Sequence, residues 1–397
     1  MHMEEIFYRY NPWWEGIYNP EGLIERDLML SSMKKHLHSR QIVLLTGLRR
    51  IGKTTLIKLF IKSLIEKEGI STHRIFYMSL DDYQLSKHTV LELIEEYRRI
   101  HKIKFSEKVF LFLDEVVYQK DFEIQLKNIY DSQNAKIYAS SSSSSILKSK
   151  KSYLTGRNII LEVLPLDFRE YLSFKKITIS KSDAHLVDRY FEDFLREGGI
   201  PEYVLKSDVE YLKELVDDII YKDIAAAYGI KNPQILKEFF LLLMERSGKT
   251  ASINKMAKIL KISPDTAKRY FEMFSDTYLV YPVVRCGKTN ERLLSPKKVY
   301  AADLGIRTFF TGFRDKGSLF ENYVYLKIRH MKPCYIYDEK TEIDFLTDKK
   351  ELIEVKYKSE IIGKQKILFD QMKSSKKIVI RNISELEKFF YVDENHK

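Results

Sequence analysis

The sequence predicts an α/β protein whose first part is a parallel β-sheet covered by helices on both faces. Through the first 165 residues or so, short apolar runs alternate with longer amphipathic stretches, as strands joined by helical crossovers do. A glycine-rich loop connects the first apolar run to the first amphipathic stretch. From about residue 181 to 280 the pattern becomes helical, and short strands return among helices beyond residue 297. We therefore expect three parts, at residues 1–180, 181–296 and 297–397, a number typical of this chain length.

The predicted strands are short, apolar and rich in β-branched or aromatic residues, as buried strands are. In the first part they are Ile42–Leu45, Ile75–Met78, Val109–Leu113 and Ile137–Ala139. Between them, two stretches have the apolar spacing of amphipathic helices, Thr54–Lys67 and Thr89–Arg99. In the last part the predicted strands are Tyr335–Tyr337, Glu342–Leu346 and Leu352–Lys356.

Composition excludes several classes of protein. Hydrophobic residues make up 44% of the chain and charged residues 31%, which excludes a disordered or fibrous protein. The two cysteines, Cys286 and Cys334, are too few for a disulfide framework or a cysteine-rich zinc site. No stretch reaches 18 apolar residues, so we expect a soluble, cytoplasmic protein without a membrane partner. The net charge of +11 favours an anionic partner.

The glycine-rich loop after Ile42–Leu45 fits the phosphate-binding pattern G-x-x-x-x-G-K-[ST] in its strand–loop–helix setting. Two glycines let the backbone curl so that its N–H groups point inward, and the helix adds the positive end of its dipole. The lysine would reach the β- and γ-phosphates of ATP, and the threonine hydroxyl would ligate Mg²⁺. The predicted nucleotide-binding residues of the loop are Gly47, Leu48, Arg49, Arg50, Ile51, Gly52, Lys53, Thr54 and Thr55.

Two carboxylates, Asp114 and Glu115, directly follow the apolar strand Val109–Leu113. At the carboxyl edge of a parallel sheet they would face the same crevice as the phosphate loop. We expect Asp114 to hold the Mg²⁺ shell and Glu115 to polarise the attacking water.

Positive charge is concentrated between Arg246 and Lys298, with twelve lysine and arginine residues against four acids. Within this stretch, Ser252–Leu260 and Asp265–Phe274 predict a helix–turn–helix, with Ser263 as N-cap and Pro264 at the first helical position. The concentrated charge favours DNA, bound mainly through phosphates and with low sequence specificity. A solvated basic face on a protein-interaction module is the alternative.

Two further segments add to these features, Leu154-Thr155-Gly156-Arg157 and Leu164-Pro165-Leu166-Asp167-Phe168-Arg169-Glu170-Tyr171. Together these motifs resemble a family of AAA+ ATPases of archaea and bacteria. In that family a P-loop ATPase domain is followed by a helical lid, a winged helix and a C-terminal restriction-endonuclease-like α/β domain. The resemblance covers nearly the whole chain. It implies an oligomeric ring, taken as a hexamer, in which a neighbouring subunit completes each ATP site.

The resemblance also implies roles for further residues. Ser140 falls at the position of a polar sensor that contacts the γ-phosphate or the attacking water. Arg157 and Arg169 are candidates for the arginine finger that stabilises charge in a neighbour's site, and Pro201 would pack on the adenine. A surface position is the alternative for either arginine, and a plain helix-breaking turn is the alternative for Pro201.

The C-terminal part carries Glu342-Ile343-Asp344 and, nine residues after Phe345, Glu354-Val355-Lys356. This spacing resembles a PD-(D/E)xK nuclease core. The resemblance implies that Asp344 and Glu354 bind Mg²⁺, that Lys356 positions or activates water, and that Glu321 joins them from a helix.

Three functions follow as expectations. The leading one is a DNA-stimulated ATPase that moves along or remodels DNA, with branched recombination and repair intermediates as the first substrates to test. The second is an ATP-gated, Mg²⁺-dependent DNA nuclease. The third, similar to the STAND class, is a nucleotide switch that controls protein partners.

Overall fold

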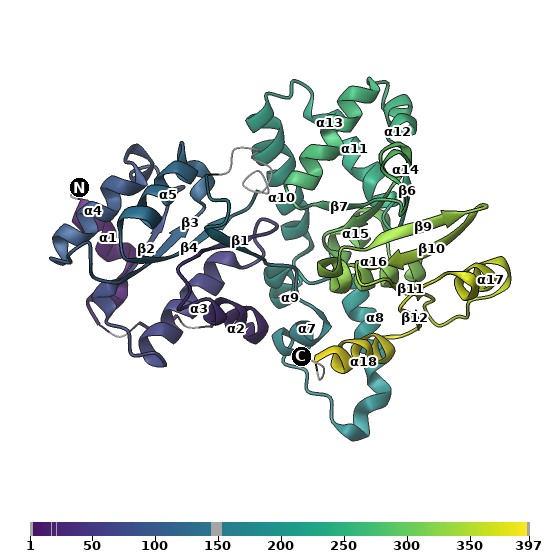
Figure 1. Ribbon diagram of the computed structural model, residues 1–397, viewed down its shortest axis with the longest axis horizontal. Coiled ribbons are helices and arrows are strands. Elements are labelled where there is room, and N and C mark those ends of the chain that lie inside the picture. Colours follow the sequence, from purple (N-terminus) through teal and green to yellow (C-terminus); the bar gives the residue numbers. More distant parts are fainter. Residues whose placement is uncertain (1–2, 17, 21, 144–152, 395–397) are drawn as a thin grey trace. The chain divides into compact units, whose positions relative to one another are not determined.

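The computed structural model describes residues 3–16, 18–20, 22–143 and 153–394 (Figure 1). The chain folds into two compact units, Met1–Val163 and Leu164–Lys397. None of the helices in the described ranges is long and apolar enough to cross a membrane.

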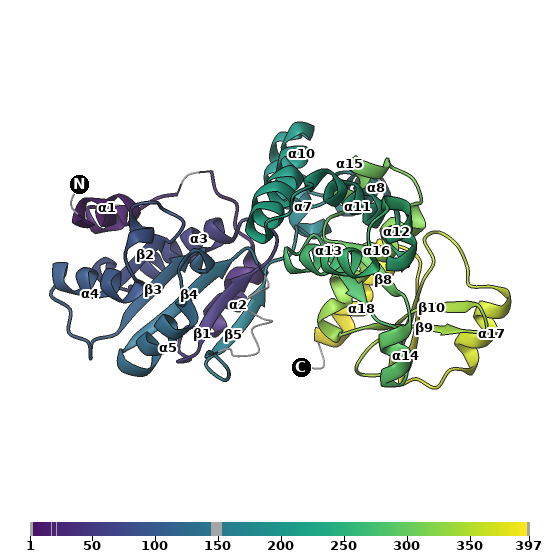
Figure 2. The same cartoon turned by 90° about the horizontal axis from the view of Figure 1, so that it is seen from above.

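The first unit is built on a five-stranded sheet in the order β2-β3-β4-β1-β5, in which every pair is parallel. The strands are β1 (Ile42–Thr46), β2 (Ile75–Ser79), β3 (Val109–Asp114), β4 (Ala135–Ser141) and β5 (Asn158–Glu162). Helices lie on both sides of this sheet (Figures 1 and 2). They are α1 (Met3–Tyr10), α2 (Asp27–Lys35), α3 (Lys53–Glu66), α4 (Val90–Ile100) and α5 (Phe122–Ser132).

The sheet confirms the prediction of a parallel α/β architecture. All residues of β1 and β3 are buried, as expected for strands covered on both faces. Strand β5 is absent from the predicted set, because it lies at the sheet edge, where its residues are only partly covered. In a parallel sheet β1 and β3 end at the same edge, and both the glycine-rich loop and Asp114 lie there.

The second unit begins with helices. They are α7 (Phe168–Phe174), α8 (Val187–Glu197), α9 (Pro201–Lys206), α10 (Val209–Asp218), a π-helical segment (Ile219–Ala226) and α11 (Pro233–Glu245). Next come β6 (Lys249–Ala251), α12 (Ile253–Leu260), α13 (Pro264–Asp276), β7 (Val280–Val283), α14 (Thr289–Leu294) and β8 (Lys297–Ala301). The three strands form an antiparallel sheet in the order β6-β8-β7. The helical pattern of the sequence does not reveal these short strands.

The predicted turn between two helices is present at α12 and α13. Ser263 caps α13 by accepting a hydrogen bond from the Thr266 N–H at 3.1 Å, and Pro264 is the first helical residue. Both assignments agree with the expectation from the sequence.

The rest of the second unit contains a four-stranded sheet in the order β12-β11-β10-β9. Its strands are β9 (Cys334–Asp338), β10 (Thr341–Leu346), β11 (Glu351–Val355) and β12 (Lys376–Ile380), and only the β11–β12 pair is parallel. The accompanying helices are α15 (Leu304–Thr311), α16 (Lys316–Ile328), α17 (Gly363–Gln371) and α18 (Ile383–Glu394). A small core that includes Ile343, Leu352 and Phe369 lies between this sheet and α17.

Two observations join the predicted middle and last parts of the chain. Strand β8 starts directly after the boundary expected at residue 296 and pairs with β6 and β7, which come before it. Cys286 and Cys334 form a disulfide, and next to it the Cys286 N–H donates to the Tyr335 carbonyl at 2.7 Å. The cysteines do not make a framework, as expected, but they tie the segment after β7 to β9.

Candidate functional site

The glycine-rich loop runs from the end of β1 to the start of α3. Gly52 has a left-handed φ of 93°, and a Cβ there would meet no atom within 4 Å. Gly47 has φ 141°, and its Cβ would lie 2.3 Å from the Val163 carbonyl oxygen. Only glycine therefore fits both bends of the loop. The first N–H groups of α3, which follow directly, have no partner inside the helix and form an anion-binding end.

The remaining loop positions divide into inward and outward side chains. Leu48 and Ile51 are buried in the domain, so they anchor the loop and leave their backbone for the ligand. Arg49 is half-buried, and Arg50 is exposed with a φ of 58°. Thr55 is half-buried in the first turn of α3.

Lys53 is the first residue of α3 and its side chain is only 4% exposed. Its ammonium donates to the carbonyls of Gly47 at 3.1 Å and Leu48 at 3.0 Å. It also lies 3.9 Å from a carboxylate oxygen of Glu115. The lysine is thus held by the loop it would serve, with its charge directed at the end of β3.

Thr54 and Asp114 lie in contact although 60 residues separate them in the sequence. The Thr54 hydroxyl donates to Asp114 Oδ2 at 2.6 Å. Asp114 is the last residue of β3 and is buried. A hydroxyl next to a carboxylate is a donor set that suits Mg²⁺, which prefers oxygen ligands.

Glu115 follows β3 with a left-handed φ of 51°, and its side chain is 19% exposed. Its Oε2 accepts hydrogen bonds from the Ser142 N–H at 3.2 Å and the Ser142 hydroxyl at 3.0 Å. Burial raises the pKa of Glu115, an effect that the nearby Lys53 charge opposes. A raised pKa suits a carboxylate that accepts a proton in a reaction near neutral pH.

Ser140 lies near the end of β4 and contacts both Asp114 and Glu115. Its hydroxyl donates to Asp114 Oδ1 and accepts from the Glu115 N–H at 2.9 Å. Its role as a sensor of the γ-phosphate or the attacking water stays a prediction.

Two residues of this site are not singled out by the sequence. Ser142 holds Glu115, as described above, and Tyr77 of β2 donates its hydroxyl to Asp114 Oδ2 at 3.1 Å. The hydroxyl is placed there because Tyr77 is two residues before the end of β2, which runs parallel to β3. A tyrosine near the end of a predicted buried strand is the available signal; Ser142 gives none, since it lies among other serines.

This arrangement fits a nucleoside triphosphate with Mg²⁺. Three features suit such a ligand: the open space at the Cβ position of Gly52, the buried ammonium of Lys53, and the paired oxygens of Thr54 and Asp114. Glu115 stands beside them as the group that would activate water.

Arg157 lies at the amino end of β5, away from the glycine-rich loop. Strand β1, with which β5 pairs, is five residues long, and it separates Arg157 from the loop by about 16 Å at the usual rise per residue. The guanidinium lies 3.2 Å from an Asp131 oxygen and 5.8 Å from the centre of the Tyr130 ring. Arg157 cannot serve its own chain's phosphate loop, so a finger role would require a second chain.

Arg169 and Pro201 lie in the second unit. Arg169 is in the first turn of α7, and its Nε lies 3.0 Å from a Glu387 oxygen. Pro201 is the first residue of α9, directly after a turn in which the Gly199 N–H donates to buried Asp303 at 2.6 Å. Their roles as finger and adenine contact stay predictions.

The basic stretch presents most of its charge to solvent. Eight of its side chains are exposed and take part in no ion pair within the described ranges: Arg246, Lys255, Lys258, Lys261, Lys268, Arg269, Lys288 and Arg292. Two members do not contribute to this surface. Lys249 pairs with Asp315 at 2.7 Å, and Lys298 is buried.

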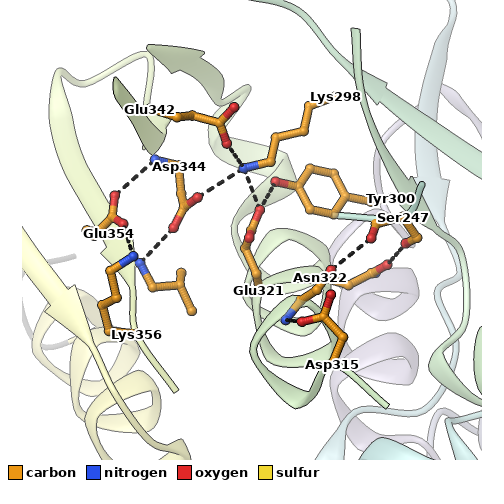
Figure 3. A network of polar contacts seen from close by, with 12 residues as sticks. Ser247, Lys298, Tyr300, Asp315, Glu321, Asn322, Glu342, Asp344, Glu354 and Lys356 are labelled. Atoms are coloured by element: carbon orange, nitrogen blue, oxygen red, sulfur yellow. Dashed lines mark hydrogen bonds and ion pairs between the residues drawn. The ribbon is translucent and has the colours of Figure 1, made fainter. Parts of the chain in front are cut away.

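The carboxylates expected to form a nuclease centre do lie together, but a lysine lies among them (Figure 3). The Lys298 ammonium contacts Glu321 at 2.7 Å, Glu342 at 2.5 Å and Asp344 at 3.0 Å. Glu354 pairs with Lys356 at 2.9 Å. Among the described residues, no group of three or more histidine, cysteine, aspartate or glutamate side chains is placed to hold a metal ion. The Mg²⁺ site expected from Asp344 and Glu354 therefore does not fit this arrangement, because an ammonium already contacts the oxygens.

Comparisons with known proteins agree with the first unit. Residues 39–172 match a family described as an AAA domain, and residues 188–317 match a domain of unknown function, DUF8612. The protein MJ1544 of Methanocaldococcus jannaschii, itself uncharacterized, is 30% identical over 396 residues, covering 94% of this chain and 86% of the relative. An uncharacterized protein of Haemophilus influenzae is 23% identical and covers 83% of this chain and 85% of its own length.

Among solved structures, the Walker-type ATPase PABY2304 of Pyrococcus abyssi is similar at a TM-score of 0.44 and 14% identity, covering 74% of this chain and 97% of that one. The parallel five-stranded sheet and the glycine-rich loop agree with the AAA match. The chain belongs to the family of the M. jannaschii protein MJ1544 and carries an AAA domain of the P-loop ATPase class.

Proposed function

We propose that this protein hydrolyses ATP and uses the energy to move along or remodel DNA. ATP hydrolysis is supported by the contact between Thr54 and Asp114 beside buried Lys53. Action on DNA is supported by the exposed basic helices of the second unit.

The residues around the phosphate loop have distinct tasks in this proposal. Lys53 would neutralise the terminal phosphates, and Thr54 and Asp114 would hold Mg²⁺, which would neutralise the charge that develops on the β- and γ-phosphate oxygens. Glu115 would accept a proton from the attacking water, since Ser142 fixes its carboxylate and burial raises its pKa. Ser140 and Tyr77 would keep Asp114 oriented.

Helix α11, strand β6, helices α12 and α13, and strands β7 and β8 come in the chain order of a winged helix, with the short helix α14 inserted between β7 and β8. We propose that α13 is its recognition helix. Thr266, Lys268 and Arg269 lie in the first part of this helix, and the two basic side chains are exposed. Contacts to phosphates would dominate, so binding would be strong at low salt and weakly dependent on sequence.

A ring of several chains, which we take to be a hexamer, would complete the ATP site. Arg157 lies too far from its own phosphate loop to act there, as its place at the amino end of β5 requires. In a ring it would leave Asp131 and stabilise charge in the next chain's site. Arg169 is the second candidate, and its partner Glu387 would have to release it.

The experiment is ATP turnover by the full chain with single-stranded, duplex and junction DNA at low salt. We expect DNA to raise turnover, and Lys268→Ala with Arg269→Ala to remove the rise while leaving DNA-free turnover unchanged. Each lost phosphate contact should also reduce the slope of log affinity against log salt by about one. Lys206→Ala with Lys222→Ala is the matched control, because both lysines are also exposed and lie in the same unit.

Turnover that stays flat with all three DNA forms would contradict the DNA half of the proposal. Turnover indifferent to DNA together with a stable protein complex would favour the nucleotide switch instead. Neither result would affect the assignment of the phosphate loop.

A further inference from the structure

The lysine among the nuclease-like carboxylates has a complete set of partners. Lys298 lies on β8, and its three acid partners come from two other elements: Glu321 from α16, and Glu342 and Asp344 from β10 (Figure 3). Its side chain is 1% exposed.

The ammonium group uses its full hydrogen-bonding capacity. An ammonium has three N–H donors, and three carboxylate oxygens lie between 2.5 and 3.0 Å from Lys298 Nζ. Glu321 is further held by the Tyr300 hydroxyl, which donates to its Oε1 at 2.6 Å. The rings of Tyr300 and Phe345 each lie 5.9 Å from the ammonium.

The two acids that the nuclease pattern assigns to metal have their remaining oxygens occupied as well. Asp344 Oδ2 accepts from the Val355 N–H at 2.9 Å. Glu354 Oε1 accepts from Lys356 at 2.9 Å and from Gln365 Nε2 at 2.6 Å, and its Oε2 accepts from the Asp344 N–H at 3.1 Å. Both carboxylates are therefore satisfied by groups of the chain itself.

We infer that the Lys298 ammonium is the resident cation of this cluster, in place of a divalent metal, and that the cluster is a structural lock and not a nuclease centre. It ties β8 to helix α16 and to strand β10. This inference is independent of ATP hydrolysis, because it concerns only the C-terminal carboxylates.

A metal cannot be added beside the lysine without removing it. Mg²⁺ needs carboxylate oxygens at 2.0–2.1 Å in an octahedral shell, and the oxygens of Glu321 and Asp344 that face the cluster centre already contact the ammonium. A divalent cation at the same oxygens would also repel the ammonium. The three carboxylate oxygens around the ammonium favour its charged form.

The test is Mn²⁺ binding to the full chain without nucleotide, monitored through the loss of the free-ion electron paramagnetic resonance signal. All chains carry Asp114→Asn, so that the phosphate-loop site does not contribute. We expect the parent chain to bind no Mn²⁺ in the C-terminal unit and Lys298→Met to bind a single ion per chain. Adding Asp344→Asn to Lys298→Met should abolish that binding. Lys297→Met, which removes the preceding, half-exposed lysine of β8, is the matched control and should gain nothing.

Two results would overturn the inference. One is Mn²⁺ binding by the Lys298-containing parent that Asp344→Asn removes. The other is a folded Lys298→Met chain that gains no ion. Should Lys298→Met fail to fold, DNA cleavage by the parent with Mn²⁺ decides the matter: cleavage that Glu354→Gln abolishes would overturn the inference, and no cleavage would support it.

Discussion

The hydroxyl of Thr54 donates a hydrogen bond of 2.6 Å to the carboxylate of Asp114. Thr54 belongs to the first turn of α3 and Asp114 ends β3, so the contact joins the end of the phosphate loop to the carboxyl end of β3. Because Thr54 contacts the carboxylate through its hydroxyl, its proposed role as a Mg²⁺ ligand can be tested separately from the role of Lys53.

Thr54→Val should therefore impair Mg²⁺-dependent ATP turnover, while Thr54→Ser should retain it. Valine has nearly the same shape but no hydroxyl, whereas serine keeps the oxygen. We expect the Mg²⁺ concentration for half-maximal turnover to rise about ten-fold or more in the valine variant. A Mg²⁺ titration of steady-state phosphate release measures this. Equal Mg²⁺ dependence in the two variants would exclude Thr54 as a ligand.

Arg157→Ala should lower turnover far more than the loss of its surface ion pair would explain. The pair with Asp131 is partly exposed, and such pairs contribute little to stability, whereas an arginine finger contributes about 10³-fold or more to rate. Arg40→Ala is the matched control, because Arg40 also lies over Tyr130, at 4.7 Å from the ring centre.

Mixing distinguishes the finger from a local effect. A chain with Lys53→Ala lacks a working pocket but keeps Arg157, and a chain with Arg157→Ala keeps the pocket. If the arginine acts across chains, the mixture should turn over ATP faster than the sum of its parts. A strictly additive rate would show that Arg157 does not act on a neighbour.

Reduction of the Cys286–Cys334 disulfide should destabilise the second unit. The two residues are 48 apart in sequence. The loss of chain entropy in the unfolded state predicts that a disulfide closing a loop of this length stabilises the fold by about 4 kcal/mol, and disulfides typically stabilise proteins by about 2–4 kcal/mol. Urea unfolding with and without reductant measures the difference. The Cys286→Ser, Cys334→Ser chain should unfold at the same midpoint as the reduced parent and show no response to reductant; a response would point to some other target of the reductant.

The carboxyl of Asp303 should make stability fall as pH rises. Burial raises the pKa of Asp303 from 3.8 to about 6, although hydrogen bonds from Gly199, Ile306 and Gly305 oppose the shift. Because the folded-state pKa is the higher one, its contribution is complete below pH 3.8 and is lost as pH rises through about 6. The loss amounts to about 3 kcal/mol.

Comparing the parent with Asp303→Asn isolates this group, since all other groups titrate in both chains. The difference between their free energies of unfolding should change between about pH 4 and pH 7 in urea titrations. A difference that is constant over this interval would show that Asp303 does not titrate there.

The sequence predicts which residues gather around the glycine-rich loop better than it predicts the rest. The glycine-rich loop and Asp114-Glu115 are local patterns, and the parallel order of the strands is enough to bring their ends to one edge. Ser142 cannot be recognised in this way, because it contributes to the site only through its hydrogen bonds to Glu115, which depend on the fold. The partner of Cys286 is likewise invisible, since 48 residues separate it from Cys334.

Lys298 is the clearest case of information that only the fold supplies. In a basic stretch it resembles one more surface lysine, and it counts there toward the DNA-binding charge. Alternation along β8 puts Lys298 on the same face as Tyr300, and Tyr300 is fully buried. That pairing is a faint sign that Lys298 points into the protein. Its three acid partners come from residues 321–344, and no local pattern connects them to β8.

We propose that the pocket around Lys53 hydrolyses ATP with Glu115 as the group that activates water. The most direct measurement is phosphate release by the full chain and by Glu115→Gln, in the presence of duplex DNA at low salt, with nucleotide binding measured in parallel. Glu66→Gln, at the far end of α3, is the control and should match the parent. We predict that Glu115→Gln binds ATP but releases phosphate about 10²–10⁴-fold more slowly. Phosphate release at the parent's rate would show that Glu115 does not activate the attacking water.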